Sequence, residues 1–499
     1  MHGDFSEGSC ALRKRSALIA TLWSGGDVLF RQGIQFLTLA LLARMLAPSD
    51  FGMIAMLSLI TGVATVLVDG GLSVALIQRQ EVTRADEATL FYFNVSIGLL
   101  LTLLIVICAP WIAAFYRAPD LITPARIMAL GCLLGSLAPV HTALLTRKLD
   151  FATQAKASTL ATTASGVIVV VLALQGWGVI ALALHGVLMA GFMSAALWWL
   201  HPWRPHAGFS FQSLRSLTHF GFFQLGASLL DMIYNRLHTP LLGRLFGARD
   251  LGLYSQADTL RQMPGNFLGS MVARAALPLF SRNTDDPTLM RRGLELSIRV
   301  MTFLMAPIML GMAVLSDVIL TCFFGLHWQD AALPLSILCL ASVLYPLHVL
   351  NVQVFYALGH AKLVFQLQVA KVLVGLLLLL ASLPFGLIGI AWGQVMFSII
   401  ALCLNTWHTH RLLNYGSCAQ LRECFPPIGA AAVASGLVLL WRYNGLPTLA
   451  PMLQLLYGGA VGAIIYLLVA FTFRLKALQD TASLARLIRQ PAKHAHENQ

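Results

Sequence analysis

The sequence predicts an all-α integral membrane protein with fourteen transmembrane helices, because of its composition, its long apolar segments and the placement of its basic residues. Hydrophobic residues make up 58% of the 499 residues and charged residues only 11%, whereas soluble domains carry about a quarter charged residues. The mean hydropathy is +0.76. The net charge of +12 is scattered through short loops rather than gathered in a patch. This distribution argues against nucleic acid as a partner and favours a polytopic membrane protein.

Apolar segments of about 20 residues, the length that crosses a bilayer, recur along the chain between turns rich in Gly and Pro. Arg13-Lys14-Arg15 precedes the first one, but Asp27 and Arg31 interrupt its apolar run. This pattern favours an uncleaved first span over a signal peptide. The predicted spans lie near 18–43, 51–71, 88–112, 123–146, 157–175, 179–200, 217–243, 252–279, 295–316, 332–357, 363–383, 387–409, 426–442 and 451–473.

The basic residues test this count, since Lys and Arg accumulate in cytoplasmic loops. With the N-terminus in the cytoplasm, most Lys and Arg outside the spans fall on the cytoplasmic side. Those on the opposite side are Arg44, Arg117, Arg244, Arg249 and Arg442. The asymmetry predicts that both termini are cytoplasmic.

The chain contains an internal repeat: the segment LLARMLAPSDFG at 41–52 resembles LLGRLFGARDLG at 241–252. Pro139-Val140-His141 also matches Pro346-Leu347-His348. Six predicted spans separate equivalent elements, so the two copies enter the membrane with the same orientation, as in transporters built from parallel repeats. The predicted domains are an N-terminal lobe of spans 1–6 (1–208), a C-terminal lobe of spans 7–12 (209–415), and two extra spans with a cytoplasmic tail (416–499).

The repeated residues have simple structural interpretations. Asp50 and Asp250 most simply cap the helices that follow. His141 and His348 most simply make interior polar contacts.

Ionisable and amide side chains gather within spans 1, 7, 8 and 11, although a charge at membrane depth costs roughly 2.5–3.5 kcal/mol and usually faces a cavity or a partner. Polar residues of span 1 are spaced four apart, and with the 200-residue offset Arg31 falls on Asp231 and Gln35 on Asn235. The residues concerned are Asp27, Arg31 and Gln35 in span 1, Asp231, Asn235 and Arg236 in span 7, Asp258, Arg261, Gln262 and Asn266 in span 8, and Lys371 in span 11.

Two interpretations of these charges stay open. Asp27 and Arg31, four apart, and Asp258 and Arg261, three apart, can neutralise each other as ion pairs within one helix. Alternatively, the recurrence on equivalent helices predicts a shared polar vestibule with a slight cationic excess. Such a vestibule suits an anionic head group, because Arg grips phosphate oxygens bidentately.

Several longer segments of the sequence resemble a known family. LLARMLAPSDFGMIAM (41–56), DGGLSVALIQRQEVTRADEATLFYFN (69–94), APWIAAFYRAPDL (109–121), LLGRLFGARDLGLYSQADTLRQMP (241–264) and ALPLFSRNTDD (276–286) resemble the polysaccharide-transporter branch of the multidrug/oligosaccharidyl-lipid/polysaccharide (MOP) exporters, which includes Wzx-type flippases. The resemblance implies a V-shaped fold of two six-helix lobes plus two helices, in a bacterial inner membrane. It also implies alternating access for an undecaprenyl-diphosphate-linked oligosaccharide repeat unit, used for exopolysaccharide, capsule or O-antigen.

Combined with the resemblance, the intramembrane residues form a hypothetical substrate site. Arg31, Arg236, Arg261 and Lys371 are expected to attract the diphosphate, and Gln35, Asn235, Gln262 and Asn266 to bind sugar hydroxyls. Asp27, Asp231 and Asp258 are expected to release the arginines or to bind a coupling cation. No cofactor, metal site or catalytic residue is predicted; coupling to protons, sodium or membrane potential stays open. The lipid-linked oligosaccharide and the bilayer are the expected partners, and polymerase and export proteins of the same pathway could be others.

Two alternative functions are compatible with the same amino-acid composition. A membrane-embedded polymerase or acyltransferase would need a catalytic base or a large outer loop, and the predicted outer loops are short. A cation-coupled drug exporter would be favoured only if an apolar cation were the cargo, and the cationic excess argues against it. The sequence contains no GxxxxGK[ST], GxSxG or HExxH motif, so none of these supports an enzyme.

Overall fold

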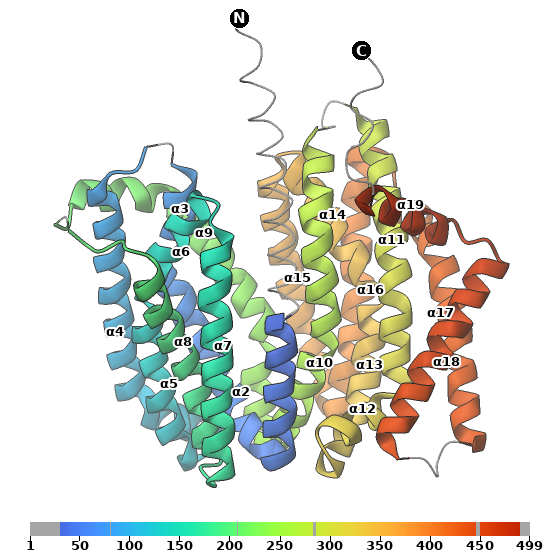
Figure 1. The fold of residues 1–499 in the computed structure, drawn as a ribbon, viewed down its shortest axis with the longest axis horizontal. Coiled ribbons are helices and arrows are strands. Elements are labelled where there is room, and N and C mark those ends of the chain that lie inside the picture. The colour runs from blue at the N-terminus through green and yellow to red at the C-terminus, as the bar shows by residue number, and fades with distance from the viewer. Residues whose placement is uncertain (1–29, 80, 207, 283–285, 446–449, 490–499) are drawn as a thin grey trace, which may run out of the picture. The chain divides into compact units, whose positions relative to one another are not determined.

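The computed structural model describes residues 30–79, 81–206, 208–282, 286–445 and 450–489, and within them every regular element is a helix (Figure 1). The chain forms two compact units, which divide between Ser255 and Gln256. The division falls inside one helix, α10 (His238–Arg282). The lobe boundary predicted at residue 208 stays a prediction.

Unit 1 contains the helices up to the start of α10. A first helix covers residues 30–45. It is followed by α2 (Pro48–Asp69), α3 (Leu72–Gln78), α4 (Arg84–Tyr116), the 3₁₀ helix η1 (Pro119–Leu121), α5 (Ile122–Gly135), α6 (Pro139–Arg147), α7 (Phe151–Leu174), α8 (Val179–Leu200) and α9 (Phe211–Arg236). Several of these helices begin at capping residues. Thr83 Oγ1 accepts from the Asp86 amide at 3.2 Å, and the Asp86 carboxylate accepts from the Thr83 amide at 3.0 Å, which satisfies the orphan donors at the start of α4.

Unit 2 contains the remainder of α10 and the helices that follow it. These are α11 (Pro287–Val314), α12 (Ser316–Phe323), the 3₁₀ helix η2 (Leu326–Ala331), α13 (Ala332–Ser342), α14 (Tyr345–Ala357), α15 (Ala361–Ser382), the 3₁₀ helix η3 (Leu383–Phe385), α16 (Gly386–Leu413), α17 (Ser417–Gly445), α18 (Pro451–Thr472) and α19 (Lys476–Arg489).

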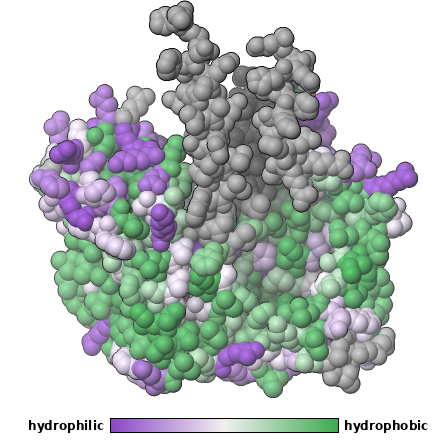
Figure 2. Space-filling view, viewed as in Figure 1, coloured by the Kyte–Doolittle hydropathy of each residue, from purple (hydrophilic) through white to green (hydrophobic). Residues whose placement is uncertain are grey.

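Nine helical segments of the described residues are long and apolar enough to cross a membrane, or ten if the bent pair Leu326–Ser342 and Tyr345–Ala357 is one span. Figure 2 shows hydrophobic residues over most of the coloured surface of the visible face, with hydrophilic residues gathered where helices end. A surface of this kind is stable in lipid but not in water. The chain is therefore a multi-pass membrane protein, while the count of fourteen spans stays a prediction.

The difference between nine and fourteen has physical reasons. Much of the first predicted span, 18–43, lies outside the described residues. The helices α9 and α10, where spans 7 and 8 are predicted, do not qualify as apolar, and they carry most of the charges discussed above. The segment Lys362–Leu413 is a single stretch by length, yet it contains α15 and α16, which pack against each other. The chain turns between them at Gly386, whose φ of 67° suits glycine.

The repeated segment at 41–52 and 241–252 has a structural counterpart. The chain leaves helical geometry at Ala47, with φ −75° and ψ 154°, and 200 residues later α10 is interrupted at Gly247, with φ 86° and ψ −178°. The Asp50 carboxylate accepts from the Ala47 amide at 3.1 Å, so the predicted capping role of Asp50 is confirmed, although Asp50 lies within the first turn of α2. Both copies therefore mark a helix restart.

The two restarted helices cross each other at paired glycines, within unit 1. A Cβ atom on Gly52 of α2 would lie 1.7 Å from the carbonyl oxygen of Ala248 in α10. A Cβ atom on Gly252 would lie 1.8 Å from the carbonyl oxygen of Pro48. The contact is reciprocal, since residue 52 meets residue 248 and residue 252 meets residue 48. Only glycine permits backbones to approach this closely.

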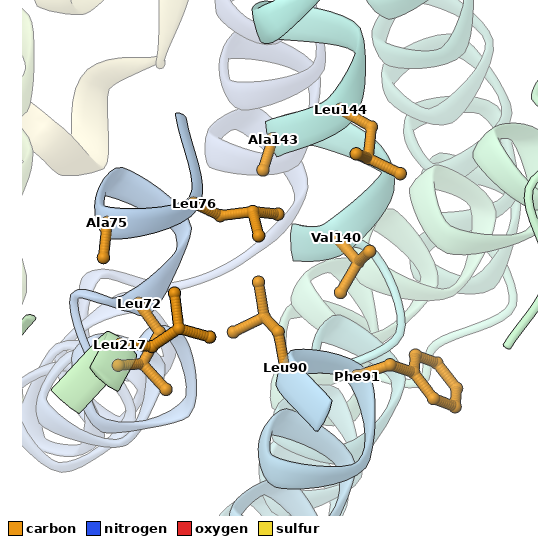
Figure 3. Packing of buried hydrophobic residues seen from close by; sticks show 9 residues of the cluster. All are labelled: Leu72, Ala75, Leu76, Leu90, Phe91, Val140, Ala143, Leu144 and Leu217. Atoms are coloured by element: carbon orange, nitrogen blue, oxygen red, sulfur yellow. The ribbon is translucent and has the colours of Figure 1, made fainter. Parts of the chain in front are cut away.

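At one end of unit 1, the helices α3, α4, α6 and α9 meet around a cluster of buried side chains (Figure 3). Leu72 and Leu76 of α3 face Leu90 of α4, and Leu217 of α9 lies beside Leu72 (Figure 3). All four are at most 2% exposed. This packing fixes the start of α9 against the helices of unit 1.

Candidate functional site

The polar residues of the first helix are half-buried near its start, and the next one along the same face is covered by another helix. Arg31 and Gln35 are half-buried, and Thr38, one turn further on the same face, is 6% exposed. A Cβ atom on Gly166 of α7 would lie 2.6 Å from Thr38 Oγ1, so α7 covers the C-terminal end of this stripe. Asp27 lies outside the described residues.

The polar residues of α9 lie on its uncovered side. Asp231, Asn235 and Arg236 are all exposed, and the Asn235 side-chain amide donates to the Asp231 carbonyl oxygen at 2.9 Å. Between these exposed residues α9 packs on α2 through Met232, whose methyl would lie 1.4 Å from a Cβ atom on Gly62. Within unit 1 the predicted polar face of α9 is therefore an accessible one.

A compact ionic cluster lies on α10 in unit 2. The Asp258 carboxylate, in a residue 6% exposed, accepts from Arg261 Nε and from the Gln262 side-chain amide, both at 2.6 Å. Arg261 also reaches α13, where its Nη1 donates to Ser342 Oγ at 3.0 Å. The first of the two open interpretations, an ion pair within one helix, is therefore what the structure contains for Asp258 and Arg261.

The face of α10 beside this cluster stays uncovered. Gln262 and Asn266 are both exposed and lie one turn apart. The helix continues through Pro264 and Gly265 without leaving helical geometry, so Gly247 is the break in α10. Gly265 serves packing, since a Cβ atom there would lie 3.4 Å from Met305 and Tyr345.

Lys371 is the most deeply buried cation of the predicted site. It lies near the middle of α15 and is 8% exposed. Within the described residues, no carboxylate lies within ion-pair distance of its ammonium group. A buried lysine without an ionic partner is costly in a membrane, and such a cost is often kept for function.

The predicted interior contacts of the two equivalent histidines are confirmed. His141 is fully buried, and its Nδ1 lies 3.1 Å from Nδ1 of His201. The His348 Nε2 atom lies 3.0 Å from Ser398 Oγ of α16. Within the ranges that the structure describes, no group of three or more His, Cys, Asp or Glu could hold a metal ion.

Two polar clusters in unit 2 were not predicted from the sequence. The Asn351 amide exchanges hydrogen bonds of 2.8 and 3.0 Å with Gln420 and accepts from Thr409 at 2.5 Å, and all three are fully buried. Arg299 of α11 binds Glu423 of α17 at 3.0 Å and Asp480 of α19 at 2.8 Å. Their partners lie 58 to 181 residues apart, so no local spacing could have indicated them.

The architecture defines a class: a multi-pass α-helical membrane protein that carries charged residues within its helices. The structure matches a lipid II flippase MurJ in an inward closed conformation with a TM-score of 0.74, over 91% of this chain and 98% of MurJ, at 14% identity. It also matches an inward-facing multidrug resistance MATE family transporter of the MOP superfamily, with a TM-score of 0.59, over 78% of this chain and 100% of the transporter, at 16% identity. The fold of this chain is therefore similar to that of these two proteins.

The chain belongs to the polysaccharide biosynthesis protein family, whose model matches residues 41–333. Teichuronic acid biosynthesis protein TuaB of Bacillus subtilis (strain 168) is 26% identical over 441 residues, covering 87% of this chain and 91% of TuaB. Succinoglycan biosynthesis transport protein ExoT of Rhizobium meliloti (strain 1021) is 27% identical over 466 residues, covering 91% and 92%. Lipopolysaccharide biosynthesis protein WzxC of Escherichia coli (strain K12) is 23% identical over 387 residues, covering 77% and 78%.

Proposed function

We propose that this protein is a flippase that moves an undecaprenyl-diphosphate-linked oligosaccharide repeat unit across a bacterial inner membrane for exopolysaccharide, capsule or O-antigen synthesis. The observation that carries the proposal is the membership of the polysaccharide biosynthesis family over residues 41–333. The relatives include a succinoglycan transport protein, matched over 91% of this chain. The MOP fold supports transport rather than catalysis as the chemistry of the chain.

The proposed topology has fourteen spans with both termini in the cytoplasm. Residues 1–208 and 209–415 form two six-helix lobes, and 416–499 form the two extra spans and the tail. Alternating access would carry the saccharide from the cytoplasmic to the periplasmic face. Polymerase and export proteins of the same pathway are proposed as further partners.

Within this proposal the cations differ in how strongly they would bind the diphosphate. Lys371 is buried and has no ionic partner in the described structure, so it offers the strongest attraction for a diphosphate. Arg31 is half-buried and Arg236 exposed, and both would bind phosphate oxygens while they remain accessible. Arg261 is held by Asp258, so it would bind the substrate only as part of an already neutralised cluster.

The amides and carboxylates complete the proposed site. Gln35, Asn235, Gln262 and Asn266 would bond sugar hydroxyls. Asp27, Asp231 and Asp258 would compete with the phosphates for the arginines, so that substrate binding and ion pairing exclude each other. Coupling to protons, sodium or membrane potential would act through these carboxylates.

A reconstituted transport assay tests the proposal. Purified protein in liposomes is supplied with a fluorescent undecaprenyl-diphosphate-linked oligosaccharide, and a quencher added outside reports the fraction that crosses. Lys371→Met and Arg31→Ala should lower the initial rate by about tenfold or more, since each removes a charge-assisted contact. Lys362→Met and Arg44→Ala are matched controls, because both alter exposed cations of the same helices outside the proposed site.

The same assay separates the rival functions. A polymerase or acyltransferase would lengthen or acylate the labelled saccharide, which mass spectrometry of the recovered lipid would detect. A drug exporter would move an organic cation and leave the lipid-linked saccharide in its original leaflet. Wild-type protein that moves no lipid-linked oligosaccharide would overturn the proposal.

A further inference from the structure

An apolar groove of about 300 Å³ lies between α2, α4 and α9, entirely within unit 1. Leu67 of α2, Phe93 and Leu100 of α4, and Phe222 of α9 line its walls. The polar side chain among the lining residues is Thr218, whose hydroxyl donates to the Leu214 carbonyl oxygen at 2.9 Å. Since α2 and α4 are membrane-spanning segments and no lining group seeks a polar partner, the groove suits hydrocarbon.

The groove has a direction, because its lining residues form two helical stripes. On α4 the stripe is Phe93, Ile97 and Leu100, and on α9 it is Thr218, Phe222 and Leu225; both follow the spacing of one helix face. Contacts between the starts of the two helices show that both begin at the same end, since the Ser210 amide donates to Thr89 Oγ1 at 3.0 Å. The groove therefore runs away from one common rim.

That rim is basic. Arg215 is exposed and lies three residues before Thr218, on the same face of α9 as the groove. Arg84, the first residue of α4, is also exposed. Arg79 donates to Ser216 at 3.1 Å, although Asp86 at 3.3 Å offsets its charge. The N-terminal ends of α4 and α9 add partial positive charge at this rim, and the C-terminal end of α2 adds partial negative charge.

The floor of the groove is part of a packed cluster of buried side chains. Leu72 lines the groove and also belongs to the buried cluster with Leu76, Leu90 and Leu217 (Figure 3). This cluster ties α3, α4 and α9 together, so the groove does not depend on the arrangement of the two units. A lipid held there would keep its place while the rest of the protein changes conformation.

We propose that this groove binds the polyprenyl chain of the lipid-linked substrate next to its diphosphate, with Arg215 at the rim drawing in the diphosphate. The inference rests on the proposed function and adds a place for the lipid end of the cargo. A volume of about 300 Å³ is at the lower end for small-molecule sites, so it accommodates one chain segment. A single-chain polyprenyl diphosphate fits this shape and rim charge better than a two-chain phospholipid.

Photolabelling tests the groove directly. The full-length protein in liposomes is irradiated with a diazirine-bearing polyprenyl diphosphate, and the labelled peptides are identified by mass spectrometry. Labels are expected on the α4 and α9 stripes, and unlabelled polyprenyl diphosphate should compete them away. A diazirine-bearing phosphatidylglycerol, the anionic phospholipid alternative, should label lipid-facing helices generally. Equal labelling of the stripes by both probes, or no competition, would overturn the inference.

Matched variants sharpen the result. Leu100→Trp fills the groove from an exposed position and should lower labelling of the stripes by about tenfold, whereas Leu99→Trp, an exposed leucine just outside it, should not. Arg215→Gln should weaken competition by the diphosphate about tenfold, and Lys156→Gln, an exposed cation on α7, should leave it unchanged. If Leu100→Trp leaves the labelling unchanged and Arg215→Gln leaves the competition unchanged, the assignment of this groove as a polyprenyl site is wrong.

The two proposals can fail separately. If wild-type protein moves the lipid-linked oligosaccharide and Leu100→Trp does so at the same rate with unchanged labelling, the groove inference falls and the flippase proposal stands. If wild-type protein moves no lipid-linked oligosaccharide yet shows competed labelling of the stripes, the transport proposal falls and the groove stands.

Discussion

The ion pair between Asp258 and Arg261 can be dissolved one partner at a time, and the structure indicates what each removal costs. The Asp258 residue is 6% exposed and its carboxylate takes two bonds of 2.6 Å, while the Arg261 side chain is 22% exposed. Breaking a fully buried pair costs about 3–5 kcal/mol because one charge is left unpaired. Partial exposure, and a membrane-embedded unfolded state that finds other partners, lower this to about 2 kcal/mol for each single variant.

Asp258→Leu and Arg261→Met are the two single variants, and the double variant replaces the pair by apolar residues of similar volume. Such replacements are often close to neutral, so the double variant should lose only about 1 kcal/mol. The double-mutant cycle then gives a coupling free energy of about 3 kcal/mol. Reversible unfolding in mixed detergent micelles measures the free energy of unfolding of each protein.

A coupling free energy below about 0.5 kcal/mol, typical of exposed pairs, would refute the argument that this pair is a held, buried contact. The double variant also decides the role of Arg261 in transport. If the pair only neutralises itself, the double variant should carry the lipid-linked oligosaccharide at the wild-type rate. Arg261 and Asp258 would then leave the proposed site.

Three further predictions follow from single positions. Lys371→Met should raise the free energy of unfolding by about 2–3 kcal/mol, since a buried cation is removed, and lower the transport rate by about tenfold or more; a less stable variant would contradict the burial argument. Gly52→Ala should cost more than about 3 kcal/mol because its Cβ would meet a carbonyl oxygen 1.7 Å away, whereas Gly33→Ala, with nothing within 4 Å, should be within about 1 kcal/mol of wild type; equal losses would refute the crossing. A threonine hydroxyl, above all, holds the pKa of Asp150 at the start of α7 below its ordinary value, so its stabilisation is present above about pH 4 and is lost as the pH falls through the lowered pKa. Asp150→Asn should flatten this part of the stability–pH curve, and an unchanged curve would contradict the capping argument.

The sequence alone predicts the class of the fold well, because it depends on apolar length and loop charge. The helices α4, α7 and α8, and the pair α5 and α6 together, lie at predicted spans, since each combines a long apolar run with a clear turn at its end. The polar helices α9 and α10 are harder, because the charges that make them functionally interesting also remove the apolar signal.

The candidate site was predictable only as a set of residues along single helices. The spacing of Asp258 and Arg261 indicated a pair within a turn, and the structure contains it. The same spacing could not show that Ser342 binds Arg261 from α13, since that contact is made across 81 residues. Burial of Lys371 likewise depends on packing between helices that no local pattern encodes.

The reciprocal crossing at Gly52 and Gly252 explains why both copies of the repeated segment carry a glycine at this position. Each glycine is the surface against which the other copy packs, so neither can enlarge without colliding with the opposite backbone. Such a contact obeys the rule of a two-fold dimer interface, in which one patch meets its own equivalent. A larger residue at either position would therefore disturb both segments at once, because each glycine contacts the backbone of the other segment.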